Sequence, residues 1–449
     1  MANLTTHATT FKKENVREFF VEPFFQGTDL RDRITVRTDI KGTEKLNRVS
    51  RPTKITKRKT APGFTPSGAL VLSVTEITVK PLAIEFEQNG RAFIDSVVQS
   101  ALASGFNLDD VENMTDPDFW GEVVLPIIAE AGKEDLIRQM WFADEKKETN
   151  DTVVVSTGVI TGVADEDYQV YTGFWTRFIE NVEDGVIPSK QRIVIDNGAV
   201  KQEVIETLSG ITAGEITLTV NNVAFVEAFD TDATTTVTNW FNTHAAAIKD
   251  RGALTGVIVT NPSAAALKFV AEHPGQAFIV TETDAGTNGS WTATGVVANV
   301  IHGPLGTDEA ENTMTEMLDK MPEELLEFPN IVFKVTRSIN RNYIGSLKST
   351  GSEAAHQIKI NGITFTSFEG IPVIVYPEWD KWIRIDHNGV FPHRAFITVM
   401  ENLFFATDGA DDDEAVETWY DRNLQLRRYR VQYKAQTIHL HNELLMFGY

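Results

Sequence analysis

Positive charge is concentrated near the N-terminus of this otherwise acidic chain. Residues 11–62 carry 14 Lys and Arg against seven Asp and Glu, a local charge of +7, whereas the 449 residues together carry −22. The remainder therefore carries −29. Charge of this kind can simply keep a surface solvated, but a basic arm on an acidic body also allows copies of one chain to attract one another. The acidic total argues against bulk binding of nucleic acid.

Composition limits the class of protein. The length predicts two to four folding units, and 42% apolar with 23% charged residues is typical of a packed globular chain. There are 27 Phe and no Cys, which favours a large apolar core and excludes disulfides and thiolate chemistry. The polar segment 1–13 is unlike a secretory signal, and no apolar run reaches ~18 residues. A cytosolic protein without a membrane span is expected.

The first 86 residues predict an extended arm followed by a long hairpin. The arm, residues 1–43, has no sustained periodicity but holds an apolar cluster that should bind the same subunit or a neighbour. The hairpin, residues 44–86, has strand-like arms at 51–60 and 69–86 around a Pro- and Gly-rich turn at 61–68. Its first strand is too polar for a core strand, so the hairpin should project. The candidate interface residues of both elements are Phe19, Phe20, Phe24, Phe25, Arg51, Lys54, Lys57, Arg58 and Lys59.

Helical spacing follows in three places. Apolar residues repeat at three and four positions over Arg91–Ser104, Asp118–Trp141 and Tyr171–Asn181. Pro126 lies within the second stretch and should kink or split that helix. Residues 152–163 have strand-like composition.

Residues 205–297 predict a small domain inserted in a loop. The segment is rich in Thr and Ala and poor in Lys and Arg. A hairpin is expected around Asn221-Asn222, then a helix from Thr234 to Lys249 capped by Asp232, then strands at 255–260, 265–270 and 277–281. About 90 residues suffice for an independent fold of the ββαββ type.

The remaining chain predicts a mixed α/β region that ends in long strands. An acidic helix is expected over Glu309–Glu327, followed by a strand at Ile331–Thr336. Further strands are expected at 357–368, 371–376, 395–400, 415–433 and 437–446.

No strong catalytic motif is present. The chain lacks a Walker-type loop, a G-x-S-x-G elbow and an H-E-x-x-H pair. His439 and His441 would face one side of a strand as two metal ligands do, but a third ligand is not evident. Asp386, His387 and His393 are expected in a turn. The acidic loop 408–414 lacks the alternating order of an EF-hand, so a solvated loop, or one contacting Lys and Arg of another copy, is expected. We therefore predict no enzyme, no metal and no cofactor.

The order of these parts resembles the HK97-fold major capsid proteins of tailed bacteriophages, including those of crAss-like and related phages. The likeness is closest in the C-terminal third, in Phe368-Glu369-Gly370-Ile371-Pro372-Val373-Ile374-Val375, Trp379, Pro392-His393-Arg394-Ala395-Phe396-Ile397-Thr398, Glu401-Asn402-Leu403, Thr407-Asp408 and Trp419-Tyr420-Asp421. The resemblance implies an α+β chain with an N-arm, an E-loop hairpin, a spine helix, a P-domain and an A-domain, into which the small α+β domain is inserted.

On this resemblance the chain divides into seven segments. They are the N-arm (1–43), the E-loop-like hairpin (44–86), the spine helix and P-domain helices (87–150), a P/A-domain segment (151–204), the insert (205–297), the A-domain (298–390), and the end of the A-domain with the C-terminal P-domain strands (391–449).

The resemblance also implies partners. Copies would form hexamers and pentamers of an icosahedral virion capsid, assembled in the host bacterial cytoplasm around double-stranded DNA held by non-specific proximity. Portal, head-fibre and auxiliary capsid proteins would be further partners. No scaffold-like coiled coil is visible, which favours a separate scaffolding protein, and no Lys–Asn cross-linking pair can be assigned. Two alternatives stay open: another virion protein such as a tail tube or sheath subunit, and a metal-dependent hydrolase that uses His439 and His441.

Overall fold

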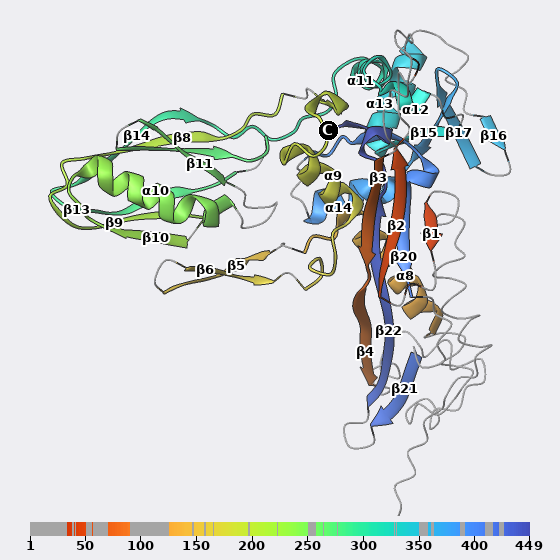
Figure 1. Ribbon diagram of the computed structural model, residues 1–449, viewed down its shortest axis with the longest axis horizontal. Coiled ribbons are helices and arrows are strands. Elements are labelled where there is room, and N and C mark those ends of the chain that lie inside the picture. Colours follow the sequence, from red (N-terminus) through yellow and green to blue (C-terminus); the bar gives the residue numbers. More distant parts are fainter. Residues whose placement is uncertain are drawn as a thin grey trace, which may run out of the picture. The chain divides into compact units, whose positions relative to one another are not determined.

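The computed structural model divides into two compact units (Figure 1). Unit 1 comprises residues 1–141, 171–175 and 400–441, and unit 2 comprises residues 142–170, 176–399 and 442–449. The structure describes residues 34–37, 40, 42–50, 56, 71–89, 125–145, 148–156, 159–164, 166–195, 198–221, 223–249, 257–263, 265–275, 277–326, 328, 330–349, 358–360, 363–386, 391–408, 416–421 and 426–449. Among these residues, no helix is both long and apolar enough to cross a membrane.

A two-stranded ribbon is the first feature of unit 1. Strand β2 (Thr43–Ser50) runs antiparallel to β3 (Val71–Thr78), with Thr43 opposite Thr78 and Ser50 opposite Val71. The single strand predicted over 69–86 is therefore wrong. It breaks at Val79, whose amide donates to the Gly42 carbonyl, and strand β4 (Lys80–Asn89) then joins a different sheet.

The main sheet of unit 1 is built around one long strand. Strand β22 (Leu426–His439) pairs along one edge with β4 and along the other with β20 (Leu403–Thr407) and β21 (Val416–Asp421), and β1 (Thr35–Arg37) pairs with β20. The predicted strands 415–433 and 437–446 thus have the wrong boundaries. The polar residues Lys434 and Gln436 do not break β22, because Ala435 between them is buried opposite Thr407.

Helix α8 (Leu125–Phe142) has the buried side chains Leu136, Met140 and Trp141, all of which belong to unit 1. Pro126 lies in the first turn of this helix, where a proline costs no intrahelical hydrogen bond. The predicted start at Asp118, and the predicted helix Arg91–Ser104, lie outside the described residues. The predicted helix at 171–181 is confirmed as α9 (Phe174–Glu183), which belongs to unit 2 from Thr176 onward.

Unit 2 contains a seven-stranded mixed sheet in the order β16-β17-β18-β15-β19-β23-β7. All five residues of β19 are buried, as expected for a central strand covered on both faces. The strands are β7 (Arg192–Ile193), β15 (Ile331–Val335), β16 (Ile358–Ile360), β17 (Ile363–Phe368), β18 (Ile371–Val375), β19 (Ala395–Val399) and β23 (Leu445–Gly448). Residues 148–164 form a separate hairpin of β5 (Glu148–Ser156) and β6 (Val159–Ala164).

The helices beside this sheet differ from the expected ones. The acidic helix predicted over Glu309–Glu327 is two helices, α11 (Glu309–Asp319) and α12 (Glu323–Leu326), because Pro322 cannot continue the first. Helices α13 (Arg337–Ser349) and α14 (Pro377–Asp386) were not predicted. Both are polar, and α13 buries only Ile339, Tyr343 and Ser346, a stripe too narrow to stand out in the sequence.

The inserted segment forms two facing sheets with a helix. Its hairpin around Asn221 is confirmed, as is the cap of the helix, where the Thr235 amide donates to Asp232 Oδ1 at 2.8 Å. The sheets have the orders β10-β9-β13 and β11-β12-β8-β14, so the insert has seven strands, two more than the five expected. The elements are β8 (Glu203–Ser209), β9 (Ala213–Val220), β10 (Val223–Ala228), α10 (Ala233–Lys249), β11 (Val257–Ser263), β12 (Ala266–Ala271), β13 (Val280–Thr287) and β14 (Ser290–Val297).

The insert has a core of its own and a narrow stem. Its buried apolar side chains form one cluster that runs from Val204 to Trp291 and centres on Trp240. The chain enters and leaves through one antiparallel bridge, in which the amides of Val200 and Val300 donate to each other's carbonyl oxygens at 3.0 and 3.2 Å. Both features are those of a self-contained insertion.

Candidate functional site

The interface residues predicted from the sequence lie outside the described part of the chain. This holds for Phe19, Phe20, Phe24 and Phe25 of the arm and for Arg51, Lys54, Lys57, Arg58 and Lys59 of the hairpin. The structure does describe the two strands that carry the basic group. Because Ser50 pairs with Val71, residues 51–70 are the connection between β2 and β3.

The base of the ribbon is fixed by apolar packing. Leu46, Ile77 and Val79 are buried in one cluster with side chains of β20 and β22. The members contributed by these two strands are Phe404, Ala406 and Ile438. Farther along, Val74 is 53% exposed, and among the described strands β2 and β3 pair only with each other. The ribbon is therefore held at its base, and Val74 is an exposed apolar residue farther along it.

Polar side chains along the ribbon base are paired across strands. Lys45 Nζ lies 3.1 Å from Glu76 Oε1, and Arg37 donates to Glu44 Oε1 at 2.9 Å. Each pair is at least partly exposed, so each contributes only about 0–1 kcal/mol to stability. The ribbon is therefore held mainly by the apolar packing at its base and by the backbone hydrogen bonds between β2 and β3.

A second long element of unit 1 is the edge strand β4. Its ten residues pair with β22, and no other strand in the described residues pairs with its opposite edge. The face that it shares with β22 carries two ion pairs, Arg430–Glu85 at 2.7 Å and Arg428–Glu87 at 3.2 Å. Charged side chains on an edge strand disfavour unplanned pairing with other chains.

A basic cavity lies in unit 2 between the start of α13 and α14. It measures about 810 Å³ and is lined by four cationic side chains and one carboxylate. The carboxylate of Asp380 accepts a hydrogen bond from the Arg337 amide at 2.8 Å and so caps α13. Burial nevertheless raises the pKa of Asp380. The lining residues are Pro304, Leu305, Arg337, Ser338, Arg341, Asn342, Pro377, Asp380, Lys381, Arg384 and His393.

His393 in this cavity has a structural role. Its Nδ1 lies 2.8 Å from Ser338 Oγ and its Nε2 lies 2.9 Å from the Gly303 carbonyl oxygen. Burial lowers its pKa, so the ring is neutral near pH 7. Asp386, expected in the same turn, is instead the last residue of α14, and His387 lies outside the described residues. The catalytic use of these residues gains no support from this geometry.

The two histidines considered as metal ligands do not share a strand. Strand β22 ends at His439, whose side chain is buried, and His441 follows the strand. The His441 amide donates to Asn402 Oδ1 at 2.8 Å. In the described part of the acidic loop, Asp408 Oδ1 accepts from the Lys434 amide at 2.9 Å, whereas residues 409–415 are not described.

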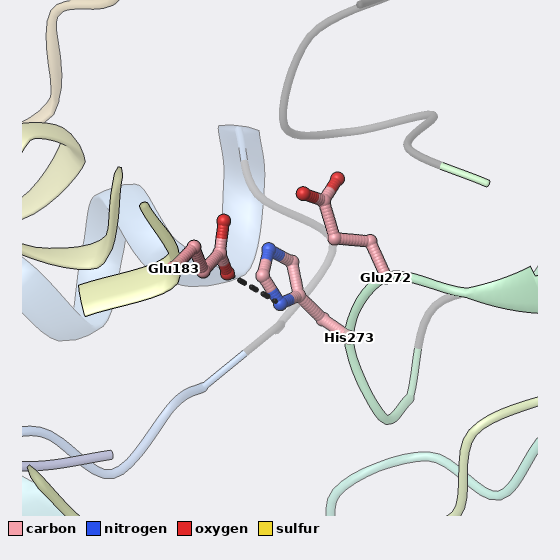
Figure 2. A group of neighbouring side chains, drawn as sticks. All are labelled: Glu183, Glu272 and His273. Carbon is pink, nitrogen blue, oxygen red and sulfur yellow. Dashed lines mark ion pairs between the residues drawn. The ribbon is translucent and has the colours of Figure 1, made fainter. Parts of the chain in front are cut away.

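Across the described residues, one group of three His, Asp or Glu side chains has its donor atoms close together. It consists of Glu183, Glu272 and His273, whose donor atoms lie within 4.8 Å of one another (Figure 2). This group could not be predicted from the sequence, because Glu183 is separated by some 90 positions from its partners and no spacing motif connects them.

Comparisons with known proteins find a likeness at the level of structure alone. No family model matches the chain, and no curated protein matches it. Among solved structures, the procapsid of satellite phage P4 is 10% identical with a TM-score of 0.39, covering 93% of this chain and 92% of that one. An encapsulin from Synechococcus elongatus is 9% identical with a TM-score of 0.38, covering 100% and 91%.

A structure from Gordonia phage Cozz is 10% identical with a TM-score of 0.38, covering 92% of this chain and 84% of that one. Capsid structures of other phages and of a GTA particle are matched at 8–9% identity. The chain itself is mixed α+β in both of its units.

Proposed function

We propose that this chain is a major capsid protein, whose copies assemble through hexamers and pentamers into an icosahedral shell around double-stranded phage DNA. The observation that carries the proposal is the ribbon β2–β3. It is fixed at its base by Leu46, Ile77 and Val79, and it leads into the basic segment 51–59. A ribbon of this kind is suited to reach a neighbouring copy, and contacts between unlike surfaces close into rings where the rotation permits.

Charge supports contact between copies. The basic residues Arg51 to Lys59 belong to a chain whose remainder is strongly acidic, so one copy offers cations and the next offers anions. The basic cavity around Arg337 and Arg341 is a second cationic surface, to which an acidic segment of another copy is matched by charge. Each exposed pair is weak, but a shell repeats every contact once per subunit.

The further partners follow from the same proposal. A portal protein, a scaffolding protein, and head-fibre or auxiliary capsid proteins would join the shell, which would assemble in the cytoplasm of the bacterial host. Packaged DNA would lie near the shell without specific contacts, in keeping with the net charge of −22. We propose no enzymatic activity for the chain.

Electron microscopy of the purified full-length chain, with sedimentation velocity, tests the proposal. Closed isometric particles are expected, alone or with a co-expressed scaffolding protein. Tubes of constant diameter would instead show a tail tube or sheath subunit, and a monomer under both conditions would contradict the capsid assignment.

A further inference from the structure

Glu183, Glu272 and His273 come from two separate parts of unit 2. Glu183 is the last residue of α9, before the insert, whereas Glu272 and His273 directly follow β12 within it. Figure 2 shows the three side chains converging from these two sides. Their donor atoms lie within 4.8 Å of one another, and His273 Nδ1 lies 3.5 Å from Glu183 Oε1. The cluster therefore spans the junction of the insert and its host.

His273 is the most informative member. Its side chain is only 7% exposed, and burial, followed by the charges of Lys201, Arg192 and Arg394, lowers its pKa to about 3. The ring is therefore neutral. Apart from the 3.5 Å approach to Glu183, no hydrogen bond to either ring nitrogen is found among the described residues. The ring nitrogens therefore have few interactions within the protein, and a ligand could bind one of them without displacing a strong hydrogen bond.

The ring is held in place by its surroundings. Phe391 packs edge-on against the imidazole, with ring centroids 4.8 Å apart. The following turn is anchored too, because the Pro274 carbonyl oxygen accepts a hydrogen bond from His302 Nε2 at 2.8 Å. Gly275 is required there, since its φ is +83° and a Cβ would lie 2.6 Å from the His302 ring. The nitrogen donor is thus fixed before any ligand binds.

The two carboxylates lie within hydrogen-bonding reach of each other. Burial, then the charge of Glu272 and a hydrogen bond with it, raises the pKa of Glu183 to about 8. Burial also raises the pKa of Glu272, although the Glu183 hydrogen bond and the charges of Lys249 and Lys201 act in the opposite direction. Two carboxylates this close are stable when a proton or a cation lies between them.

Three of the nearby cations have other contacts as well. Lys201 Nζ donates to the Glu272 backbone oxygen at 2.6 Å, and Arg394 Nε donates to the Phe391 carbonyl oxygen at 2.8 Å. The Arg192 guanidinium stacks over the Tyr449 ring at 4.3 Å. Their charges reduce the net negative charge of the cluster. A weakly charged site with a nitrogen donor favours a transition metal over Ca²⁺ or Mg²⁺, which prefer oxygen ligands.

We propose that Glu183, Glu272 and His273 form a binding site for a divalent transition metal, Zn²⁺ being the best match, that joins the insert to the rest of unit 2. Three protein ligands of this type leave a fourth position for water. Bond lengths of about 2.0–2.2 Å require donor atoms roughly 3.5 Å apart, so the glutamate side chains must move inward by about 1 Å. Both glutamate side chains are partly exposed, and both can make this movement.

Zn²⁺ titration of tag-free, chelator-treated full-length protein tests the site. Calorimetry should give one site per chain with a Kd on the order of 10 μM or tighter, and Ca²⁺ should not compete. Replacing Glu183 by Gln or Glu272 by Gln should weaken binding at least about tenfold. The matched control is Glu227→Gln, which alters a His–Glu pair with His244 at 3.6 Å that lacks a second carboxylate and should bind Zn²⁺ like wild type.

The melting temperature gives an independent readout. Zn²⁺ should raise it in the wild type and in Glu227→Gln, but not in Glu183→Gln, because a ligand stabilises only the state that binds it. Circular dichroism verifies that each variant is folded, and the two glutamine variants serve as alternatives if one of them is not. The proposal is overturned if the wild type binds no Zn²⁺, or if Glu183→Gln and Glu272→Gln both bind it unchanged. The two carboxylates would then share a proton.

Discussion

The side-chain amide nitrogen of Gln191 donates to the carbonyl oxygen of Leu445 at 2.6 Å. The same nitrogen donates to the Asn442 carbonyl oxygen at 2.8 Å, and the Gln191 side chain is buried. The segment that precedes the insert is thereby joined to the last strand of the chain, about 250 positions later. Strand β23 also pairs with β7 directly beside this contact.

We expect Gln191→Leu to destabilise unit 2 by about 1–3 kcal/mol, because the buried Leu445 carbonyl oxygen and the part-buried Asn442 carbonyl oxygen lose this donor while the volume is nearly kept. Urea denaturation followed by tryptophan fluorescence measures the change in midpoint. Lys190→Leu, at an exposed position next to it, is the control and should leave the midpoint within error. Equal midpoints for Gln191→Leu and wild type would contradict the assigned role.

The insert should fold on its own. A fragment of residues 200–300 contains the whole cluster around Trp240 and both halves of the Val200–Val300 bridge. We expect a single cooperative melt by circular dichroism. Trp240→Ala should remove about 3–5 kcal/mol and abolish that transition, whereas Thr243→Ala, on the exposed face of α10, should not. A fragment without a cooperative melt would mean that the fold depends on the rest of unit 2.

The stability of the insert should fall as pH rises from about 4.5 to 7. Burial, then a hydrogen bond with Glu282, raises the pKa of Glu206 to about 7, so the folded state binds a proton that the unfolded state releases. Stability is then greatest at the acidic end of this window and is lost as pH rises through 7. Glu206→Gln should flatten this dependence and stabilise the insert at pH 8 by on the order of 1 kcal/mol.

Thermal melting of the fragment between pH 5 and pH 8 measures this effect. Glu203→Gln is the control, since Glu203 lies on the same strand but is paired with Lys268 at 2.7 Å. If the Glu206→Gln fragment retains the wild-type pH dependence of stability, that dependence arises from other titratable groups.

Assembly should depend on the basic segment between β2 and β3. Reversing Lys54, Lys57 and Lys59 to Glu together should leave the monomer folded and block closed particles, although any single exposed pair contributes only about 0–1 kcal/mol. Sedimentation velocity measures the formation of closed particles, and circular dichroism measures whether the monomer is folded. Reversing the exposed Lys190, Lys320 and Lys348 makes the same change in net charge and is the control. If the triple variant still forms normal particles, the contacts must come from Leu70, Leu72 and Val74.

The acidic loop 408–414 should not bind a metal ion tightly. Its carboxylates are adjacent in sequence, so few can converge on one ion, and one oxygen of Asp408 is already used by the Lys434 amide. Calorimetry with Ca²⁺ should show no micromolar binding. Binding of that strength, lost in the double variant Asp411→Asn and Asp413→Asn, would be evidence for a site.

Local signals in the sequence predicted the elements that depend on local interactions. The Asp232 cap and the Asn221 turn each rest on contacts within a few positions, and each is confirmed. Helix α13 was missed because it buries three side chains and is otherwise polar. The cluster of Glu183 and His273 was missed for a different reason: only the folded chain brings these two residues together. The pairing of β4 with β22 could not be predicted for the same reason, because the paired residues are more than 330 positions apart in the sequence.

The bridge between Val200 and Val300 has a consequence for the history of the gene. Because the hundred residues between them leave and rejoin the chain at two hydrogen-bonded neighbours, their removal opens a gap that a short turn can span. A single recombination event could therefore add or delete the whole segment in frame without disturbing the strands on either side. Relatives of this chain should accordingly include proteins that lack the segment, or that carry an unrelated domain at the same two positions.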